Sequence, residues 1–329
     1  MMQIEFSASN NPENWITSIA EQLKVPVKNN SFYLPSSVGE GIVKHYYPIP
    51  GLTLSYLHLQ VNKPLSFIRK PVESSLLIPI MFFSQEMSLQ QDVDNQQKLI
   101  GYHTSNGIFM PSSQVGARWM IPAHQWFYNV TITFRIDWLL NNLTGKEDTY
   151  LHKLLKSNEP FYLFESLSPG MLQVIESIDK IMKGESKIQH LILHQKTLEL
   201  LILFLQKIEK RSILKNTARL HTNDIESIFQ IRKCILESLP DTPSVNKLAS
   251  DAGMSVSKLQ KCFKQVFGKS IIQYALSEKM QSAKRLLDTN KYSVSEVGYL
   301  IGYSNLSHFS EAFKSEFGIN PKAYLLSIL

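Results

Sequence analysis

LASDAGMSVSKLQKCFKQVFG (248–268) and VGYLIGYSNLSHFSEAFKSEFG (297–318) are two copies of one pattern, and their closing Phe-Gly pairs lie 50 residues apart. Apolar residues recur at helical spacing in both copies, and the turn in the middle of the second copy is one residue longer. Each copy therefore predicts two helices joined by a tight turn. We place these two helix-turn-helix units at residues 244–268 and 294–318.

A small residue followed four positions later by a glycine marks the turn of each copy. The pairs are Ala249 with Gly253 and Gly298 with Gly302. Glycine tolerates backbone conformations that other residues avoid, so a close helix crossing and a sharp turn are expected at each pair. One such turn is a weak signal because many helical proteins contain one, whereas two in tandem are specific.

The C-terminal part of the chain, residues 244–325, resembles the DNA-binding domain of AraC/XylS-type bacterial transcription regulators, in which one long helix joins two helix-turn-helix units. Two positions depart from the family pattern: Gly298 stands where alanine is commoner, and Leu325 follows Tyr324 where arginine is usual. The resemblance implies a regulator that binds double-stranded DNA, most often as an activator, with RNA polymerase as a second partner. It is carried by Phe263, Lys264, Phe267, Gly268, Tyr274, Ala283, Leu286, Leu287, Gly302, Tyr303, Ser304, Phe309, Phe313, Lys314, Gly318 and Pro321.

Positive charge is concentrated in the first unit and the segment that follows it. The formal net charge of +6 suits a polyanionic partner without proving one. Residues 258–291 contain eight Lys or Arg and two acids, whereas residues 292–329 contain two lysines and three acids. Attraction to DNA phosphates is therefore expected mainly from the first unit and the connecting helix.

A helix that docks in the major groove buries one face on its own domain and turns polar side chains toward the bases. By their positions in the family pattern, the base-reading residues are Ser257, Gln260 and Lys261 in the first unit and Ser307, His308 and Glu311 in the second. Glu311 either accepts from cytosine N4 or is a solvated acid, and both interpretations stay open. The expected phosphate contacts are Lys258, Lys264, Lys269, Asn305 and Lys314.

The N-terminal part predicts a β-sandwich or barrel. Residues 41–137 contain six or more short segments rich in β-branched and aromatic residues, separated by Pro, Gly, Asn and Ser. Helical periodicity begins near residue 138 and is strongest in 188–208, whose apolar residues need the sandwich, other helices or a second chain to cover them. The family resemblance implies a cupin-like jelly roll, and we expect homodimerisation through the helices of 168–213.

These patterns together predict an α+β chain of two domains. Residues 1–213 are expected to form the effector-binding jelly roll with its dimerisation helices, and residues 214–221 a linker. Residues 222–329 are expected to form the all-α DNA-binding domain with its tandem helix-turn-helix units.

Three strings in the N-terminal part, at 34–59, 134–139 and 196–205, resemble the AraC subgroup typified by the pyochelin regulator, whose members sense ferric siderophores. The resemblance implies a small-molecule effector, with a sugar-responsive regulator as the alternative. A binding cavity needs inward aromatic side chains and a few polar groups, although an ordinary core has the same composition. Candidates on chemistry alone are Tyr102, Arg118, Trp119, Trp126 and Tyr128.

An enzyme fused to a DNA-binding module, such as an alkyl-transfer repair protein, is a competing hypothesis. Such an enzyme needs a reactive cysteine, and residues 1–233 contain none. The two cysteines, Cys234 and Cys262, show no metal-binding spacing, and His190 and His194 lack a third ligand, so no metal or other cofactor is expected. A ligand-binding sandwich with a decayed helix-turn-helix is a third reading, which the intact glycines oppose. No signal peptide or membrane span is expected, which predicts a cytoplasmic protein.

Overall fold

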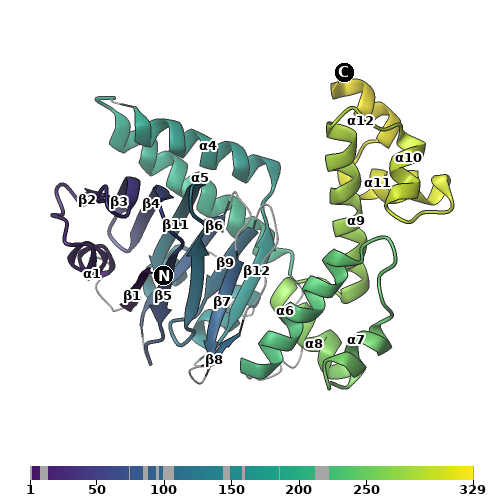
Figure 1. Ribbon diagram of the computed structural model, residues 1–329, viewed down its shortest axis with the longest axis horizontal. Helices are drawn as coiled ribbons and strands as arrows, with labels where there is room; N and C mark the ends of the chain where they lie inside the picture. Colours follow the sequence, from purple (N-terminus) through teal and green to yellow (C-terminus); the bar gives the residue numbers. More distant parts are fainter. Residues whose placement is uncertain are drawn as a thin grey trace. The chain divides into compact units, whose positions relative to one another are not determined.

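The structure is a computed structural model that divides into two compact units, residues 1–222 and 223–329 (Figure 1). The first unit is rich in β-sheet and the second, in its described residues, is helical, as expected of an α+β chain of two domains. The linker expected at 214–221 lies outside the described residues. Those residues are 2–7, 14–73, 75–83, 88–93, 96–98, 107–143, 149–157, 160–184, 186–211 and 222–328.

The strands of the first unit form two sheets within the described residues. One, the five-stranded sheet, has the order β1-β5-β10-β7-β8, and the other, the seven-stranded sheet, has the order β12-β9-β6-β11-β4-β3-β2. Apart from the parallel pair β1–β5, neighbouring strands are antiparallel. The strands are β1 Met2–Ser7, β2 Ser31–Tyr33, β3 Gly39–Ile49, β4 Leu52–Val61, β5 Leu65–Lys70, β6 Leu77–Phe83, β7 Ser88–Val93, β8 Gln96–Lys98, β9 Gly107–Pro111, β10 Ala117–Ile121, β11 Trp126–Arg135 and β12 Tyr162–Ser166.

Strand β11 shows how the two faces of the seven-stranded sheet differ. It lies between β4 and β6, where Thr131 pairs with Ser55 and Met81. Successive side chains of a strand point to opposite faces. The even-numbered Val130 and Ile132 therefore join an apolar core under the helices, and the odd-numbered residues from Asn129 to Thr133 face the other way.

Helices α4 and α5 lie side by side across the outer face of the seven-stranded sheet (Figure 1). Ser168 caps α4, since its hydroxyl accepts from the Met171 amide, and Pro169 follows at the first helical position, where its missing N–H is no loss. The helices of this unit are α1 Asn14–Leu23, α2 Ile136–Asn142, α3 Tyr150–Lys156, α4 Pro169–Lys183 and α5 Gln189–Glu209.

The second unit repeats one helical arrangement. Two short helices, α7 and α10, each begin at a serine cap, Ser244 and Ser293, and each is followed by a 12-residue helix, α8 and α11. The long helix α9 connects the two copies. The elements are α6 Thr222–Glu237, α7 Val245–Asp251, α8 Val256–Phe267, α9 Ile271–Asp288, α10 Val294–Leu300, α11 Leu306–Phe317 and α12 Pro321–Ile328.

Helix α6 completes the core of the first copy. Arg232 of α6 is fully buried, and its Nε donates to the Tyr274 hydroxyl of α9 at 2.6 Å. Its guanidinium also lies over the rings of Phe267 and Tyr274. The chain after α6 then contacts α9, because the Lys279 ammonium of that helix donates to the Pro240 carbonyl at 3.3 Å. It also lies against the second copy, since a Cβ added at Gly302 would lie 2.2 Å from the same carbonyl oxygen. The two copies are thus joined by packing as well as by α9.

Candidate nucleic-acid interface and effector cavity

Helices α8 and α11 have matching ends. Ser255 and Asn305 cap their N-termini, and Gly268 and Gly318 end them in the left-handed conformation. Their buried faces include Leu259, Cys262, Phe263 and Val266 in α8 and Phe309 and Phe313 in α11. Each helix is therefore fixed at both ends and along one face.

The predicted base-reading residues lie on the opposite face of each helix. Ser257 and Gln260 are exposed and Lys261 is half-buried in α8, and Ser307, His308 and Glu311 are exposed in α11. The structure thus brings each set of three together on one open helix face. The capping residues Ser255 and Asn305 bond main-chain amides, so none of these six side chains takes part in a cap.

The predicted phosphate contacts divide into two groups. Lys258 binds Asp224, Lys269 donates to the Ser277 hydroxyl at 2.8 Å, and the Asn305 carbonyl accepts from the amides of Ser307 and His308. These three side chains already have protein partners. Lys264 and Lys314, in contrast, form no ion pair with any described residue.

The partner of Lys258 was not apparent from sequence. Asp224 lies 34 positions earlier, in the first turn of α6, and its side chain is 9% exposed. The Lys258 Nζ lies 2.6 Å from its Oδ1, and this hydrogen bond raises the pKa of the Lys258 ammonium. The only signal for this contact in the sequence was an acidic residue, Asp224, near the start of a preceding helix.

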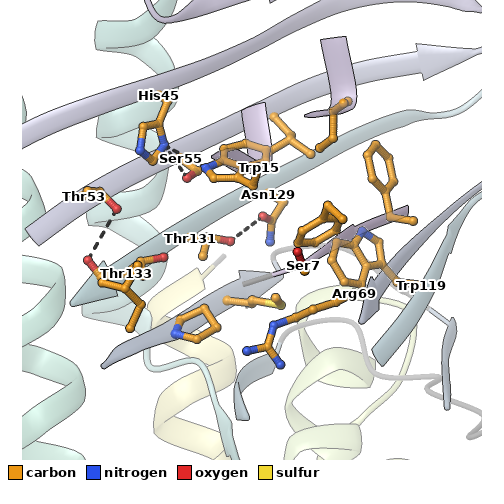
Figure 2. A pocket seen from close by; sticks show the side chains of 17 residues that line it. Ser7, Trp15, His45, Thr53, Ser55, Arg69, Trp119, Asn129, Thr131 and Thr133 are labelled. Atoms are coloured by element: carbon orange, nitrogen blue, oxygen red, sulfur yellow. Dashed lines mark hydrogen bonds between the residues drawn. The ribbon is translucent and has the colours of Figure 1, made fainter. Parts of the chain in front are cut away.

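A cavity lies between the two sheets of the first unit (Figure 2). Its volume is about 720 Å³, counted together with its opening to solvent. The five-stranded sheet and α1 contribute an aromatic wall, and the seven-stranded sheet contributes hydroxyl and amide groups. The lining residues include Phe6, Trp15, Phe67, Arg69 and Trp119 on the aromatic side and His45, Thr53, Ser55, Asn129, Thr131 and Thr133 on the polar side.

The five effector candidates occupy different places. Trp119 lines the cavity, whereas its neighbour Arg118 is buried but does not line it. The Tyr128 hydroxyl donates to the Ile175 carbonyl of α4 at 2.8 Å, and Trp126 stacks on His58 with ring centroids 4.4 Å apart, so both lie on the outer face of the sheet. Tyr102 lies outside the described residues.

Sequence reasoning did not select Arg69, His45 or Trp15 for the cavity. Arg69 ends the run LSFIR, where an arginine is ordinarily a solvated strand end. The sequence did contain one signal for Arg69: it lies two positions after Phe67, so both side chains must lie on one face of β5. His45 and Trp15 come from separate segments that only the fold brings together.

The sequence pattern described as "Regulatory protein PchR N-terminal domain" matches residues 40–220, more than half of the chain, and a pattern described as "Helix-turn-helix domain" matches residues 248–327. The chain belongs to the AraC family of transcriptional regulators and carries an N-terminal domain of the PchR family. The AraC-type assignment made from the tandem repeat is thereby confirmed.

Relatives of this AraC-family chain match it over part of their length. The Msm operon regulatory protein of Streptococcus mutans is 33% identical over 97 residues, which is 30% of this chain and 35% of that protein. The MmsAB operon regulatory protein of Pseudomonas aeruginosa is 24% identical over 208 residues, 63% of this chain and 64% of that protein. The chain therefore aligns with less than two thirds of either relative.

Among solved structures, the DNA-binding domain of AdpA in complex with a target DNA is 28% identical to this chain. The match covers 31% of this chain and 91% of the AdpA chain, with a TM-score of 0.30. Within the described residues, no helix is long and apolar enough to cross a membrane. The same residues contain no group of three or more His, Cys, Asp or Glu side chains placed to hold a metal ion.

Proposed function

We propose that this protein is a sequence-specific DNA-binding transcription regulator whose activity is set by a small molecule. The observation that carries the proposal is the pair α8 and α11, two capped helices of equal length with one polar face each. Such helices suit successive major grooves on one side of a duplex, about 34 Å apart. The exposed Gln260 and the half-buried Lys261 carry side chains that recognise adenine and guanine edges.

Selection of DNA from a random pool by the full chain tests this proposal. We expect an enriched sequence with two half-sites about 10 base pairs apart. Gln260→Ala should relax the base preference at a position in one half-site, and Ser307→Ala at a position in the other. A pool that stays random after repeated rounds would overturn the proposal.

The environment of Cys262 argues against the alternative that the chain is an alkyl-transfer enzyme. Cys262 is fully buried among apolar residues, and burial raises the pKa of its thiol. A thiol that accepts an alkyl group needs access and a lowered pKa. We therefore propose that the chain is not an enzyme.

We further propose that α5 forms a homodimer with its copy. Ile188, which immediately precedes this helix, and Leu191 and Ile202 within it are exposed apolar side chains, at 56%, 68% and 51%. With Gln195, Leu198 and Leu205 they follow alternating spacings of three and four residues, which is the repeat that packs against an identical helix.

The N-terminal unit supports the proposal of a cupin-like jelly roll that holds the effector in the cavity between its sheets. Ferric siderophores are the first effector class to test, with sugars as the alternative. The four tryptophans of the chain, at 15, 119, 126 and 138, all belong to this unit, so tryptophan fluorescence follows its unfolding alone. A rise in melting temperature with ferric siderophore and none with iron-free siderophore or sugars supports that class.

Regulation is proposed to be activation through contact with RNA polymerase in the cytoplasm. Transcription in vitro from a promoter that carries the selected DNA sequence tests this step. Activation requires more transcript with the protein and its effector than in the absence of the protein. Less transcript with the protein than without it would make the protein a repressor.

A further inference from the structure

A buried arginine lines the cavity without a counter-ion among the residues that the structure describes. Arg69 is 1% exposed, and its Nη1 donates to the main-chain carbonyls of Ser112 at 3.1 Å and Val115 at 2.5 Å. Its Nη2 is buried, and within the described part of the chain this atom has no hydrogen-bond partner and the guanidinium pairs with no carboxylate. A buried charge without an opposite charge is costly, which points to a partner from outside the chain.

His45 offers a second unused donor on the opposite wall. The Trp15 indole N–H, which can only donate, lies 3.3 Å from His45 Nδ1, and the Ser55 hydroxyl lies 2.9 Å from the same atom. An accepting Nδ1 leaves the ring hydrogen on Nε2, which is buried and finds no hydrogen-bond partner among the described residues. Burial lowers the pKa of His45 to about 4, so the ring is neutral at pH 7. Both unused groups are donors, so their missing partners are acceptors.

The wall around Arg69 is flat and aromatic. Arg69 pairs across the strands with Phe6 of β1 and Ala117 of β10. Trp119 stacks on Phe67 with ring centroids 5.8 Å apart and planes inclined by 14°, and Phe6 meets Trp119 edge-on at 5.6 Å. In Figure 2 the Arg69 and Trp119 side chains lie near each other, with Thr53 and Thr133 on the far side. A planar ring finds both stacking and edge contacts on such a wall.

We infer that the cavity binds an organic anion in which a carboxylate, bound by Arg69, is attached to a flat aromatic portion held against Trp119 and Phe67. A guanidinium recognises a carboxylate through parallel N–H···O bonds, and Nη2 is the atom available for one of them. The hydroxyl and amide groups of the seven-stranded sheet would receive further polar atoms of the ligand. This inference rests on the proposed function in that the bound anion is the effector.

Isothermal titration of the full-length protein tests the inference with matched probes. 2-Naphthoate carries both the carboxylate and the flat ring system, 2-naphthamide lacks only the charge, and decahydro-2-naphthoate lacks only the aromatic rings. We expect 2-naphthoate to bind about tenfold or more tightly than either analogue, because each analogue loses one of the two interactions. Equal binding of the amide and the carboxylate overturns the role of Arg69, and equal binding of the saturated acid overturns the aromatic wall.

Variants test the residue itself. Arg69→Gln should abolish the preference for 2-naphthoate over 2-naphthamide, whereas Arg69→Lys, which keeps the charge, should retain part of it. Arg135→Gln is the matched control, because the Arg135 side chain of the same unit is 44% exposed, pairs with Asp137 and is not part of the cavity lining. If Arg69→Gln does not fold, the comparison of the three probes on the unaltered protein still tests whether the cavity binds an aromatic carboxylate. Retention of the preference in a folded Arg69→Gln protein overturns the inference.

DNA selection separates this inference from the proposed function. A protein that enriches a DNA sequence but binds none of the three probes is a regulator whose cavity takes another ligand, so the inference fails alone. A protein that binds 2-naphthoate with the expected preference but enriches no DNA supports the anion site and overturns the regulator proposal.

Discussion

The ammonium of Lys258 lies 2.6 Å from the carboxylate of Asp224, so a lysine of helix α8 is tied to the first turn of α6. Asp224 is almost completely buried, while the Lys258 side chain is 45% exposed. The lysine thus neutralises a buried acid that otherwise lacks a described partner. This contact fixes the N-terminal turn of α8 in place.

Lys258 and Lys261 should therefore differ when each is replaced by methionine. Lys258→Met leaves the buried Asp224 carboxylate unpaired and should lower the stability of the second unit by about 1–3 kcal/mol. Lys261→Met should leave stability unchanged and weaken DNA binding. Hydrogen exchange of α6 and α8 peptides and fluorescence anisotropy with a selected duplex measure the two effects. Equal loss of stability in both variants would contradict this assignment.

Asp224→Asn should release Lys258 toward DNA. Removing the carboxylate frees one ammonium on the α8 surface, so the slope of log affinity against log salt should steepen by up to about one unit. Lys258→Met in the same Asp224→Asn background should restore the original slope. An unchanged slope in Asp224→Asn would show that Lys258 does not reach a phosphate.

The two turn glycines should tolerate alanine unequally. Both have positive φ, +61° at Gly253 and +89° at Gly302, and an L-residue in this region costs about 1–2 kcal/mol. At Gly253 an added Cβ meets nothing within 4 Å, whereas at Gly302 it would lie 2.2 Å from the Pro240 carbonyl oxygen. Gly302→Ala must shift that backbone and should cost about 1–3 kcal/mol more than Gly253→Ala. Hydrogen exchange of the α7 and α10 peptides in the full chain provides the comparison.

Acid should destabilise the first unit through His45. Its folded pKa of about 4 lies below the ordinary value of 6.5, so the unfolded chain binds the proton more tightly. The contribution of His45 to the free energy of unfolding is therefore fully present above pH 6.5. It is lost as the pH drops from 6.5 toward 4, by about 3 kcal/mol in total. Urea unfolding followed by tryptophan fluorescence measures this slope, and His45→Gln should flatten it. A slope that His45→Gln leaves unaltered would assign the acid sensitivity to other groups.

The apolar stripe of α5 should control the oligomeric state. Leu191→Asp places a charge at its most exposed apolar position and should convert a dimer to a monomer in sedimentation equilibrium. Gln206→Asp adds the same charge to the same helix outside the stripe and should leave the dimer intact. A protein that is monomeric before any substitution would contradict the proposed dimer.

Several features of this protein could be predicted from its sequence because they depend on short-range patterns. The repeated turn glycines and the helical spacing identify both helix-turn-helix units, since caps, turns and apolar faces are set by residues within one or two helical turns of each other. The alternation along 126–135 likewise separates Asn129 and Thr131 from Val130 and Ile132. In each case periodicity determines which side chains share a face.

The tertiary structure alone decided what each face meets. Periodicity places Phe67 and Arg69 on one side of β5, but only the pairing of β5 with β1 and β10 turns that side toward the cavity. The same pairing puts Trp119 inside, while the register of β11 turns Tyr128 outward under α4. Lys258 meets Asp224 across 34 residues for the same reason. Such partners are selected by the packing of distant segments, which local sequence patterns do not encode.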